Sequence, residues 1–165
     1  MIVPNVILKE KIGPDWHDIE TKEYFQKSRV IVFSLPGAYT PVCSNEQLPD
    51  YEKNYDSFIS LGIDEVYLCT VNDFFVTEAW FKSLKIEKVK FIADGSGEFT
   101  RQMGMLVKKD NLGFGYRSWR YAALIENCMV KKTWVEEGKM DNCPDDPYSV
   151  TDPAYIHKDI IDGIE

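Results

Sequence analysis

The sequence is poor in the residues that build metal and nucleotide centres. Its two histidines, His17 and His157, lie far apart, so a histidine-rich metal site is not expected. None of the four cysteines forms a CxxC pair, which argues against a zinc ribbon and against a dithiol redox motif. The segment Asp94–Gly97 has neither the full dinucleotide-binding glycine pattern nor a Walker lysine, so we expect a turn there.

Positive charge is also scarce. The chain has 19 Lys and Arg against 27 Asp and Glu, a formal net charge of −8, which argues against nucleic-acid and anionic-membrane partners. No window has the length of a transmembrane helix, and the first residues lack the sustained apolar stretch of a signal peptide. We therefore expect a reducing cytoplasmic location, with an organelle left open if the chain is a processed form.

What the sequence does contain is a regular succession of apolar segments, and its 165 residues are expected to form one domain, residues 1–165. A hairpin is predicted over residues 4–21, with its turn at Gly13-Pro14-Asp15. The other predicted strands are 29–35, 65–71, 90–93, 121–126 and 130–136. The predicted helices cover 43–60, kinked at Pro49, then 76–85, 97–105 and a last helix capped by Thr151 or Asp152, with Ile156, Ile160 and Ile161 as its apolar face. Residues 108–119 are expected to be a glycine-rich loop.

This order of elements predicts the fold class. A parallel βαβ half followed by an antiparallel hairpin and a terminal helix indicates an α/β domain with a central mixed sheet flanked by helices. That is a thioredoxin-like fold, here extended by the N-terminal β-hairpin.

The stretch from Arg29 to Ser44 carries the strongest functional signal. A buried strand is stopped by Pro36 and Gly37, and a short loop then places Cys43 at the start of a helix. Unpaired N–H groups and the helix dipole at that position favour an ionised thiolate. The alternative is that Cys43 is a small buried core residue, the usual place of a free cysteine. The loop position and the stiff flanking prolines make the reactive interpretation somewhat the better one.

Two kinds of side chain could assist such a thiol. Thr40, three residues before Cys43, could hold a substrate oxygen through its hydroxyl, or could equally be a helix cap. Arg117 and Arg120 precede an apolar strand, where an arginine needs a partner. That partner could be the thiolate or, as the more common case, one of the acidic residues.

The remaining cysteines and aromatic residues give weaker signals. Cys69 lies in a predicted buried strand and is expected to be structural, and Cys128 lies in a turn. Cys143 lies in a polar loop, where we expect it to be exposed and able to bridge to Cys43 if the loop comes near. Phe114 and Trp119 could line a pocket, although a core or rim position is more common for aromatic residues.

The segment PGAYTPVCS, residues 36–44, resembles the PxxxTxxC active-site motif of peroxiredoxins, and its residues are most similar to those of the peroxiredoxin-5 (type II, atypical) subfamily. The similarity continues through the segments EQLPDY (46–51), TVNDFFVTEAW (70–80), FIADGSGEFTRQMGM (91–105) and LGFGYRSWRYAALIE (112–126). Ordered agreement over nearly the whole chain is far more specific than a lone cysteine.

The resemblance implies a thiol peroxidase that reduces hydrogen peroxide and alkyl hydroperoxides in antioxidant defence, without a cofactor or metal. It implies that Cys43 is the peroxidatic cysteine, that Pro36 shields it and that Thr40 binds the peroxide. Arg120, which directly precedes the segment YAALI, takes the role of the family's arginine in stabilising the thiolate. Gly37, Phe114 and Trp119 are the candidate substrate-pocket residues.

The sequence also departs from the family in ways that bear on the second half of the reaction. Gln47 stands where many relatives have histidine, and Cys69 is one residue too late to match the resolving cysteine of plant-type relatives. The resemblance therefore implies a one-cysteine mechanism with glutathione and glutaredoxin as reductant. A thioredoxin-dependent enzyme with Cys143 as resolving cysteine is the alternative, and a redox sensor that relays oxidation to a partner is another. The subfamily also implies a homodimer.

Overall fold

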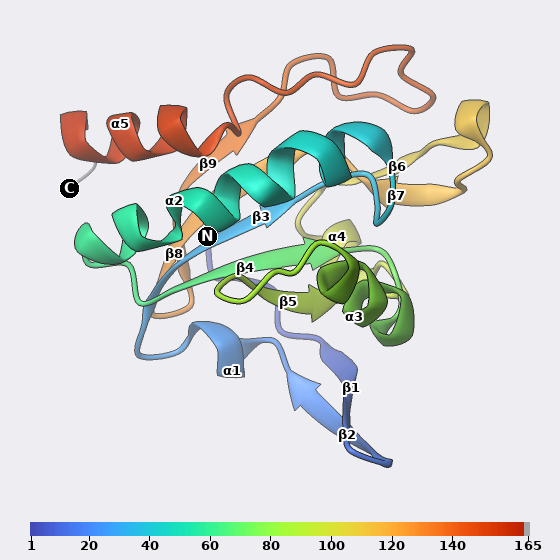
Figure 1. Ribbon diagram of the computed structural model, residues 1–165, viewed down its shortest axis with the longest axis horizontal. Coiled ribbons are helices and arrows are strands. Elements are labelled where there is room, and N and C mark those ends of the chain that lie inside the picture. Colours follow the sequence, from blue (N-terminus) through green and yellow to red (C-terminus); the bar gives the residue numbers. More distant parts are fainter. Residues whose placement is uncertain (164–165) are drawn as a thin grey trace.

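The computed structural model describes residues 1–163 and shows a central sheet covered on both faces (Figure 1). The strands are β1 (Ile7–Ile12), β2 (Asp15–Glu20), β3 (Arg29–Ser34), β4 (Glu65–Thr70), β5 (Lys90–Ala93), β6 (Leu106–Lys108), β7 (Tyr116–Ser118), β8 (Tyr121–Glu126) and β9 (Met129–Val135). The helices are α1 (Lys22–Phe25), α2 (Leu48–Ser60), α3 (Phe74–Ser83), α4 (Glu98–Gln102) and α5 (Pro153–Gly163), with a π-helical turn η1 (Cys43–Gln47) and a 3-10 turn η2 (Asp110–Leu112). None of the helices in residues 1–163 is long and apolar enough to cross a membrane.

The five-stranded central sheet has the order β5-β4-β3-β8-β9. Strands β3, β4 and β5 are parallel and joined by crossover helices, β8 runs antiparallel to β3, and β9 runs antiparallel to β8 at the edge of the sheet. The central sheet is therefore mixed, and β1 and β2 form the separate N-terminal hairpin. The predicted thioredoxin-like fold class is confirmed.

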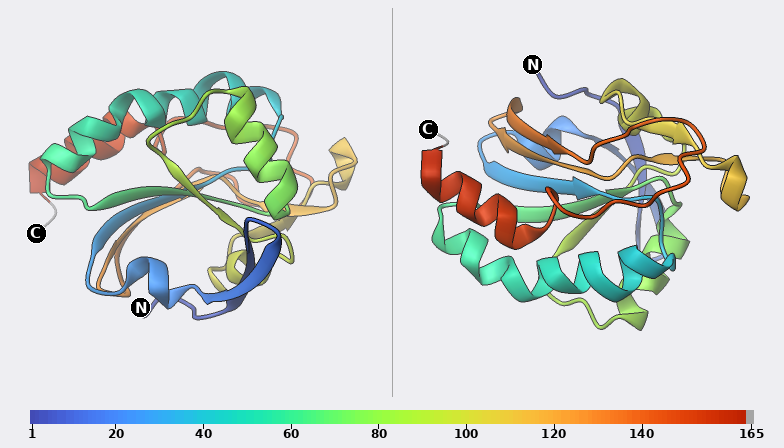
Figure 2. Two further views of the ribbon diagram at one scale, coloured as in Figure 1. Left: turned by 60° about the horizontal axis from the view of Figure 1, so that its bottom comes forward. Right: turned by 90° about the horizontal axis from the view of Figure 1, so that it is seen from above.

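Side chains of the central strands alternate between the two faces of the sheet, because successive residues of a strand point in opposite directions. Ile31 and Phe33 pack in one core cluster with residues of α2, α3 and α5. Val30 and Val32 pack in the other cluster with residues of β1, α1 and α4. Figure 2 shows the sheet between the elements that cover its two faces, with α2 and α5 side by side on one face.

Some predicted elements are corrected by the structure. The predicted loop of residues 108–119 is not one long loop, because β6 and β7 pair antiparallel with Val107 opposite Arg117 and form a second hairpin. Pro49 does not kink the helix from within, because it lies in the first turn of α2, where no N–H is needed. The irregularity precedes it, as the widened turn η1 that begins at Cys43.

Local side-chain bonds explain where two helices begin. Asp73 accepts a hydrogen bond from the backbone N–H of Val76 at 3.0 Å, so α3 begins at Phe74, earlier than expected. Asp152, rather than Thr151, accepts from the N–H of Ala154 and precedes α5. The predicted apolar face of α5 is correct for Ile156 and Ile160, but Ile161 is exposed.

Glu136 ties the loop before α5 to the sheet. Its buried carboxylate accepts hydrogen bonds from the backbone N–H groups of Ser149 and Thr151 and from both hydroxyls. Burial by itself would raise the pKa of Glu136, but these hydrogen bonds outweigh burial and hold the pKa below its ordinary value. The carboxylate therefore stabilises the folded chain in its ionised form.

We expect Glu136→Gln to lower the free energy of unfolding by about 2 kcal/mol, because the amide leaves buried donors without an acceptor. Since the folded pKa is depressed, this contribution is present above the pKa of an unfolded glutamate, about 4.3, and is lost as the pH falls through the folded value. Urea unfolding at neutral and acidic pH measures both effects, with the exposed neighbour variant Glu137→Gln as the control. Equal stability of the two variants at neutral pH would contradict the assignment.

Candidate active site

The register of β3 and β8 brings the active-site segments together. Ser34, the last residue of β3, lies opposite Tyr121, the first residue of antiparallel β8. The chain that leaves β3 towards Cys43 therefore starts beside Arg120, which directly precedes β8. This site is at the carboxyl end of the parallel strands, where open α/β sheets commonly bind ligands.

Cys43 is fully buried and lies in the first turn of the helical segment that continues into α2. Its sulfur lies 3.6 Å from Nη1 of Arg120, which donates a hydrogen bond to it. A guanidinium at this distance favours the negative thiolate over the neutral thiol, because the charged form gains both a Coulomb attraction and a charge-assisted hydrogen bond. The structure thus brings together the thiol and the arginine that the sequence selected.

Arg120 is itself buried and held from several sides. Nη1 also contacts Oε1 of Gln47, Nη2 donates to Asp146 at 2.6 Å, and the guanidinium carbon lies 5.7 Å from the ring centroid of Tyr148. Burial disfavours the charge of the guanidinium, but the negative groups at Cys43 and Asp146 outweigh burial and raise the pKa of Arg120 above its ordinary value. Arg120 therefore stays charged at the thiol.

The loop between β3 and Cys43 is fixed by short hydrogen bonds. The hydroxyl of Thr40 donates to the carbonyl of Gly37 at 2.7 Å, and the N–H of Ala38 donates to Oδ1 of Asn72 at 2.9 Å. Pro36 and Gly37 are buried, and Thr40 is partly exposed. Thr40 thus holds the loop through the hydroxyl that the sequence assigned to substrate, and it remains at the edge of the site.

A cleft of about 300 Å³ opens next to this loop. Pro36, Thr40, Phe114 and Cys143 are among its lining residues, which agrees with a pocket position for Phe114. The remaining lining residues are Pro41, Lys109, Leu112, Pro144, Asp145 and Asp146. Trp119 was a further pocket candidate, but the structure places it in the core with its indole N–H donating to the carbonyl of Glu136 at 2.8 Å.

The three other cysteines lie in different parts of the structure, and Cys143 is the one that lines the cleft beside the active-site loop. Cys69 packs in the core cluster on the opposite face of the sheet, and burial, followed by the nearby charge of Asp94, raises the pKa of its thiol. Cys128 lies in the β8–β9 turn. Cys143 was expected to be exposed, but it is buried because Asn111 donates to its carbonyl and holds the loop down.

Sequence reasoning did not identify two of the residues that hold Arg120. Gln47 had a usable signal, because residues four apart on a helix share a face and Gln47 follows Cys43 by that spacing. Asp146 had none, because it comes from an irregular loop that only the tertiary structure brings to the site.

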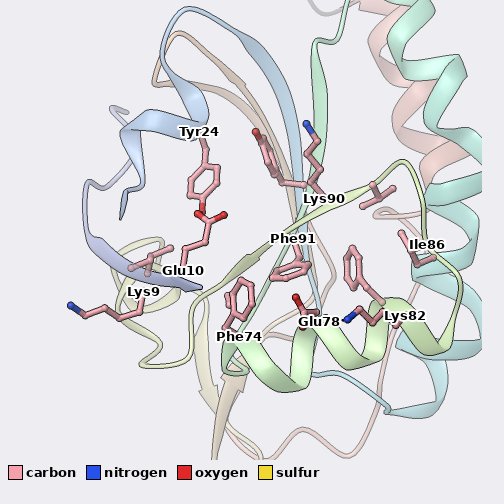
Figure 3. A pocket seen from close by; sticks show the side chains of 14 residues that line it. Lys9, Glu10, Tyr24, Phe74, Glu78, Lys82, Ile86, Lys90 and Phe91 are labelled. Carbon is pink, nitrogen blue, oxygen red and sulfur yellow. Dashed lines mark hydrogen bonds and ion pairs between the residues drawn. The ribbon is translucent and has the colours of Figure 1, made fainter. Parts of the chain in front are cut away.

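A larger hollow of about 470 Å³ lies elsewhere, between α3, the edge strand β5 and the N-terminal hairpin (Figure 3). The rings of Phe74 and Phe91 lie at its centre. The lysines that line it are paired with carboxylates, as Lys9–Asp18, Lys82–Glu78 and Lys90–Glu65. It has no cysteine or histidine among its lining residues, so the chemistry is assigned to the Cys43 site. Within residues 1–163 no cluster of side chains is arranged to hold a metal ion.

The fold and the site together define a thioredoxin-like domain with a single thiol–arginine centre. The model of the redoxin family matches residues 3–147. A peroxiredoxin of Rhizobium etli is 59% identical over 149 residues, which cover 88% of this chain and 83% of that protein. This chain therefore belongs to the peroxiredoxins, and it is an enzyme that reduces peroxides with electrons from thiols.

Two solved structures support the same placement. The Plasmodium falciparum antioxidant protein, described as a 1-Cys peroxiredoxin, is 37% identical with a TM-score of 0.95, over 99% of this chain and 98% of that one. Reduced Prx3 of Vibrio vulnificus, solved in complex with H2O2, is 30% identical with a TM-score of 0.87, over 98% of this chain and 94% of that one.

Proposed function

We propose that Cys43 is the peroxidatic cysteine and that the enzyme works by a one-cysteine mechanism. The observation that carries this proposal is the buried Cys43 sulfur 3.6 Å from the guanidinium of Arg120. The thiolate attacks one peroxide oxygen, the O–O bond breaks, and the other oxygen leaves as an alcohol, or as water from hydrogen peroxide, after it takes up a proton. Cys43 becomes a sulfenic acid.

The surrounding groups have distinct roles in this proposal. Arg120 stabilises first the thiolate and then the negative charge that develops on the leaving oxygen. Thr40 can bind the peroxide through its hydroxyl, whose lone pairs remain available while its hydrogen is shared with the Gly37 carbonyl. Buried Pro36 limits access of water to the sulfur. The H2O2 complex of the Vibrio relative supports hydrogen peroxide as one substrate.

The second half-reaction is proposed to use an external thiol. A first thiol condenses with the sulfenic acid, releasing water and leaving a mixed disulfide on Cys43, and a second thiol attacks that disulfide and regenerates Cys43. Glutathione with glutaredoxin is the proposed reductant. The packing of Cys69 on the opposite sheet face and the place of Cys128 in the β8–β9 turn support the absence of an internal resolving thiol, as does the 1-Cys description of the Plasmodium relative. Cys143 is buried but lines the cleft beside the loop, so it is the thiol that the test must examine.

Mass spectrometry of peroxide-treated protein tests this mechanism. With one equivalent of peroxide followed by glutathione, we expect a glutathione adduct on the peptide that contains Cys43, because a one-cysteine mechanism leaves the sulfenic acid for an external thiol. A Cys43–Cys143 disulfide that forms without glutathione would contradict the one-cysteine mechanism and would favour the thioredoxin-dependent alternative. The variant Cys143→Ser is the control, since it should form the same adduct.

We further propose a homodimer formed through the loops beside the site. Tyr39 in the active-site loop and Phe75 at the start of α3 are each 55% exposed. The Ala38–Asn72 hydrogen bond joins the loop that carries Tyr39 to the segment that leads into α3 and Phe75. Large apolar side chains that are exposed on joined segments are typical of interfaces.

We expect Phe75→Asp to shift the protein from dimer to monomer, because it places a charge in an apolar interface. Sedimentation velocity measures the change, and the exposed Tyr155→Asp on α5 serves as the control. A wild-type protein that sediments as a monomer at all concentrations would contradict the dimer.

A further inference from the structure

Arg117 in β7 contacts the active-site loop although it makes no hydrogen bond to Cys43. Its Nη1 donates to the carbonyl of Pro36 at 3.3 Å, and its Nε donates to the carbonyl of Phe114 at 3.2 Å. The guanidinium carbon lies 5.3 Å from the ring centroid of Phe114, within the range of a cation–π contact. Pairing of Arg117 with Val107 in the β6–β7 hairpin fixes the backbone from which the side chain extends.

Gly37 shows how closely the guanidinium approaches the loop. A Cβ atom added at Gly37 would lie 2.2 Å from Nη1 of Arg117, so the guanidinium occupies the space of a side chain at that position. Oδ1 of Asn72 lies near the same point, 3.6 Å from that Cβ position, and accepts from the N–H of Ala38. The loop is thus held between Asn72 and Arg117.

Two successive carbonyls of the loop are held by two different side chains. Arg117 holds the carbonyl of Pro36, and the hydroxyl of Thr40 holds the carbonyl of Gly37. The peptide plane between Pro36 and Gly37 helps to set where Thr40 and then Cys43 are placed, because they follow Gly37 by three and six residues in the same short loop. A shift at Pro36 would therefore move the substrate-binding hydroxyl and the sulfur together.

We propose that Arg117 is a positioning residue for the peroxidase reaction, which holds the Pro36–Gly37 segment and adds a second positive charge to the field at Cys43. The proposal rests on the proposed role of Cys43. Burial lowers the pKa of Arg117, and the negative charge of the Cys43 thiolate opposes that shift, so the two charges interact even without a direct hydrogen bond. Arg120 contacts the reacting sulfur, whereas Arg117 acts through the loop and through its charge.

The test compares Arg117→Met, which removes the charge, with Arg117→Lys, which keeps the charge but loses the planar fork. The fraction of Cys43 present as thiolate is measured across pH by ultraviolet absorbance and by alkylation with iodoacetamide followed by peptide mapping. The rate constant with hydrogen peroxide is measured by stopped flow. The alkylation needs no peroxidase activity, so its result is separate from the success or failure of the proposed function.

For Arg117→Met we expect the thiolate to appear at higher pH, because a positive charge is lost. We expect the peroxide rate at neutral pH to fall about tenfold, because the loop that places Thr40 and Cys43 is also released. Arg117→Lys should leave thiolate formation near the wild-type pH yet lower the peroxide rate roughly threefold, because one ammonium cannot replace the fork that fixes the loop. Lys108→Met, which removes a positive charge from the same β6–β7 hairpin, is the control and should match the wild type. Thermal unfolding shows that the variants are folded.

Two results would overturn the proposal. The first is a wild-type peroxide rate in Arg117→Met. The second is a lower rate in both variants with thiolate formation unmoved in Arg117→Met and no recovery in Arg117→Lys, which would mean that Arg117 only supports the fold.

Discussion

Replacing Cys43 with serine should abolish peroxide reduction. The hydroxyl of serine does not ionise near neutral pH, and it cannot take up the peroxide oxygen as a thiolate does when it forms a sulfenic acid, so the first step is lost at this position. We expect the second-order rate constant with hydrogen peroxide to fall by a factor on the order of a thousand or more, equivalent to about 4 kcal/mol of activation free energy. Stopped-flow measurement of peroxide consumption with glutathione and glutaredoxin present shows the loss.

The control for this substitution is Cys128→Ser, which changes a cysteine in the β8–β9 turn without touching the site. It should keep the wild-type rate. Full activity in Cys43→Ser would contradict the proposed function, because the thiol next to Arg120 would then be unnecessary.

Replacing Arg120 should have the second largest effect. Arg120→Met removes the donor and the charge 3.6 Å from the Cys43 sulfur, and it also leaves Oε1 of buried Gln47 without a donor. We expect the peroxide rate to fall roughly 100-fold to 1000-fold, the loss typical of removing a group that stabilises developing negative charge. The thiolate absorbance should also appear at higher pH than in the wild type.

A second substitution separates the effect of the charge from that of the hydrogen bonds, and a further variant is the control. Arg120→Lys keeps a positive charge but cannot contact Cys43, Gln47 and Asp146 with one fork, so its rate should lie between those of the wild type and Arg120→Met. Arg101→Met, which breaks an exposed ion pair with Glu98 on α4, is the control and should be nearly neutral. A thiolate titration that does not move in Arg120→Met would refute the electrostatic role of Arg120.

The pairing of Asp146 with Arg120 has a consequence for the mechanism. Asp146 lies on the irregular loop before α5, and its carboxylate is bound to the same guanidinium that faces the sulfur. The carboxylate reduces the net positive charge near Cys43, while it fixes the orientation of the guanidinium. In the proposed mechanism the reactivity of Cys43 therefore also depends on Arg117, which adds a positive charge and holds the Pro36 carbonyl.

Several features could be predicted from residue patterns alone. The apolar run before Pro36 and the breaker pair that follows it define β3 and the loop, because a buried strand needs a continuous run of branched and aromatic side chains. The position of Cys43 in a first helical turn also followed from local sequence. The opposite orientation of Cys69 followed from the two-residue period of a strand, and the structure shows it in the other core cluster.

Other features could not be predicted, and each has a physical reason. The β6–β7 hairpin lies in a polar, glycine-rich segment whose pairing depends on contacts across its own turn, so it has little apolar periodicity. Trp119 and Cys143 are buried although their neighbours are polar, because segments distant in the sequence cover them. The residues next to a position in the sequence do not show which distant segment will cover it in the fold.

The sequence by itself determined the strand and turn that carry the thiol, and its resemblance to the family motif selected Cys43 and chose Arg120 over Arg117. Only the tertiary structure decided which other groups act on that pair. The register of β3 against β8 sets the distance from Arg120 to Cys43, and the loops bring Asp146 and Arg117 to the site. Local signals depend on interactions between neighbours in the chain, whereas an active site depends on distances between segments that meet only when the core packs.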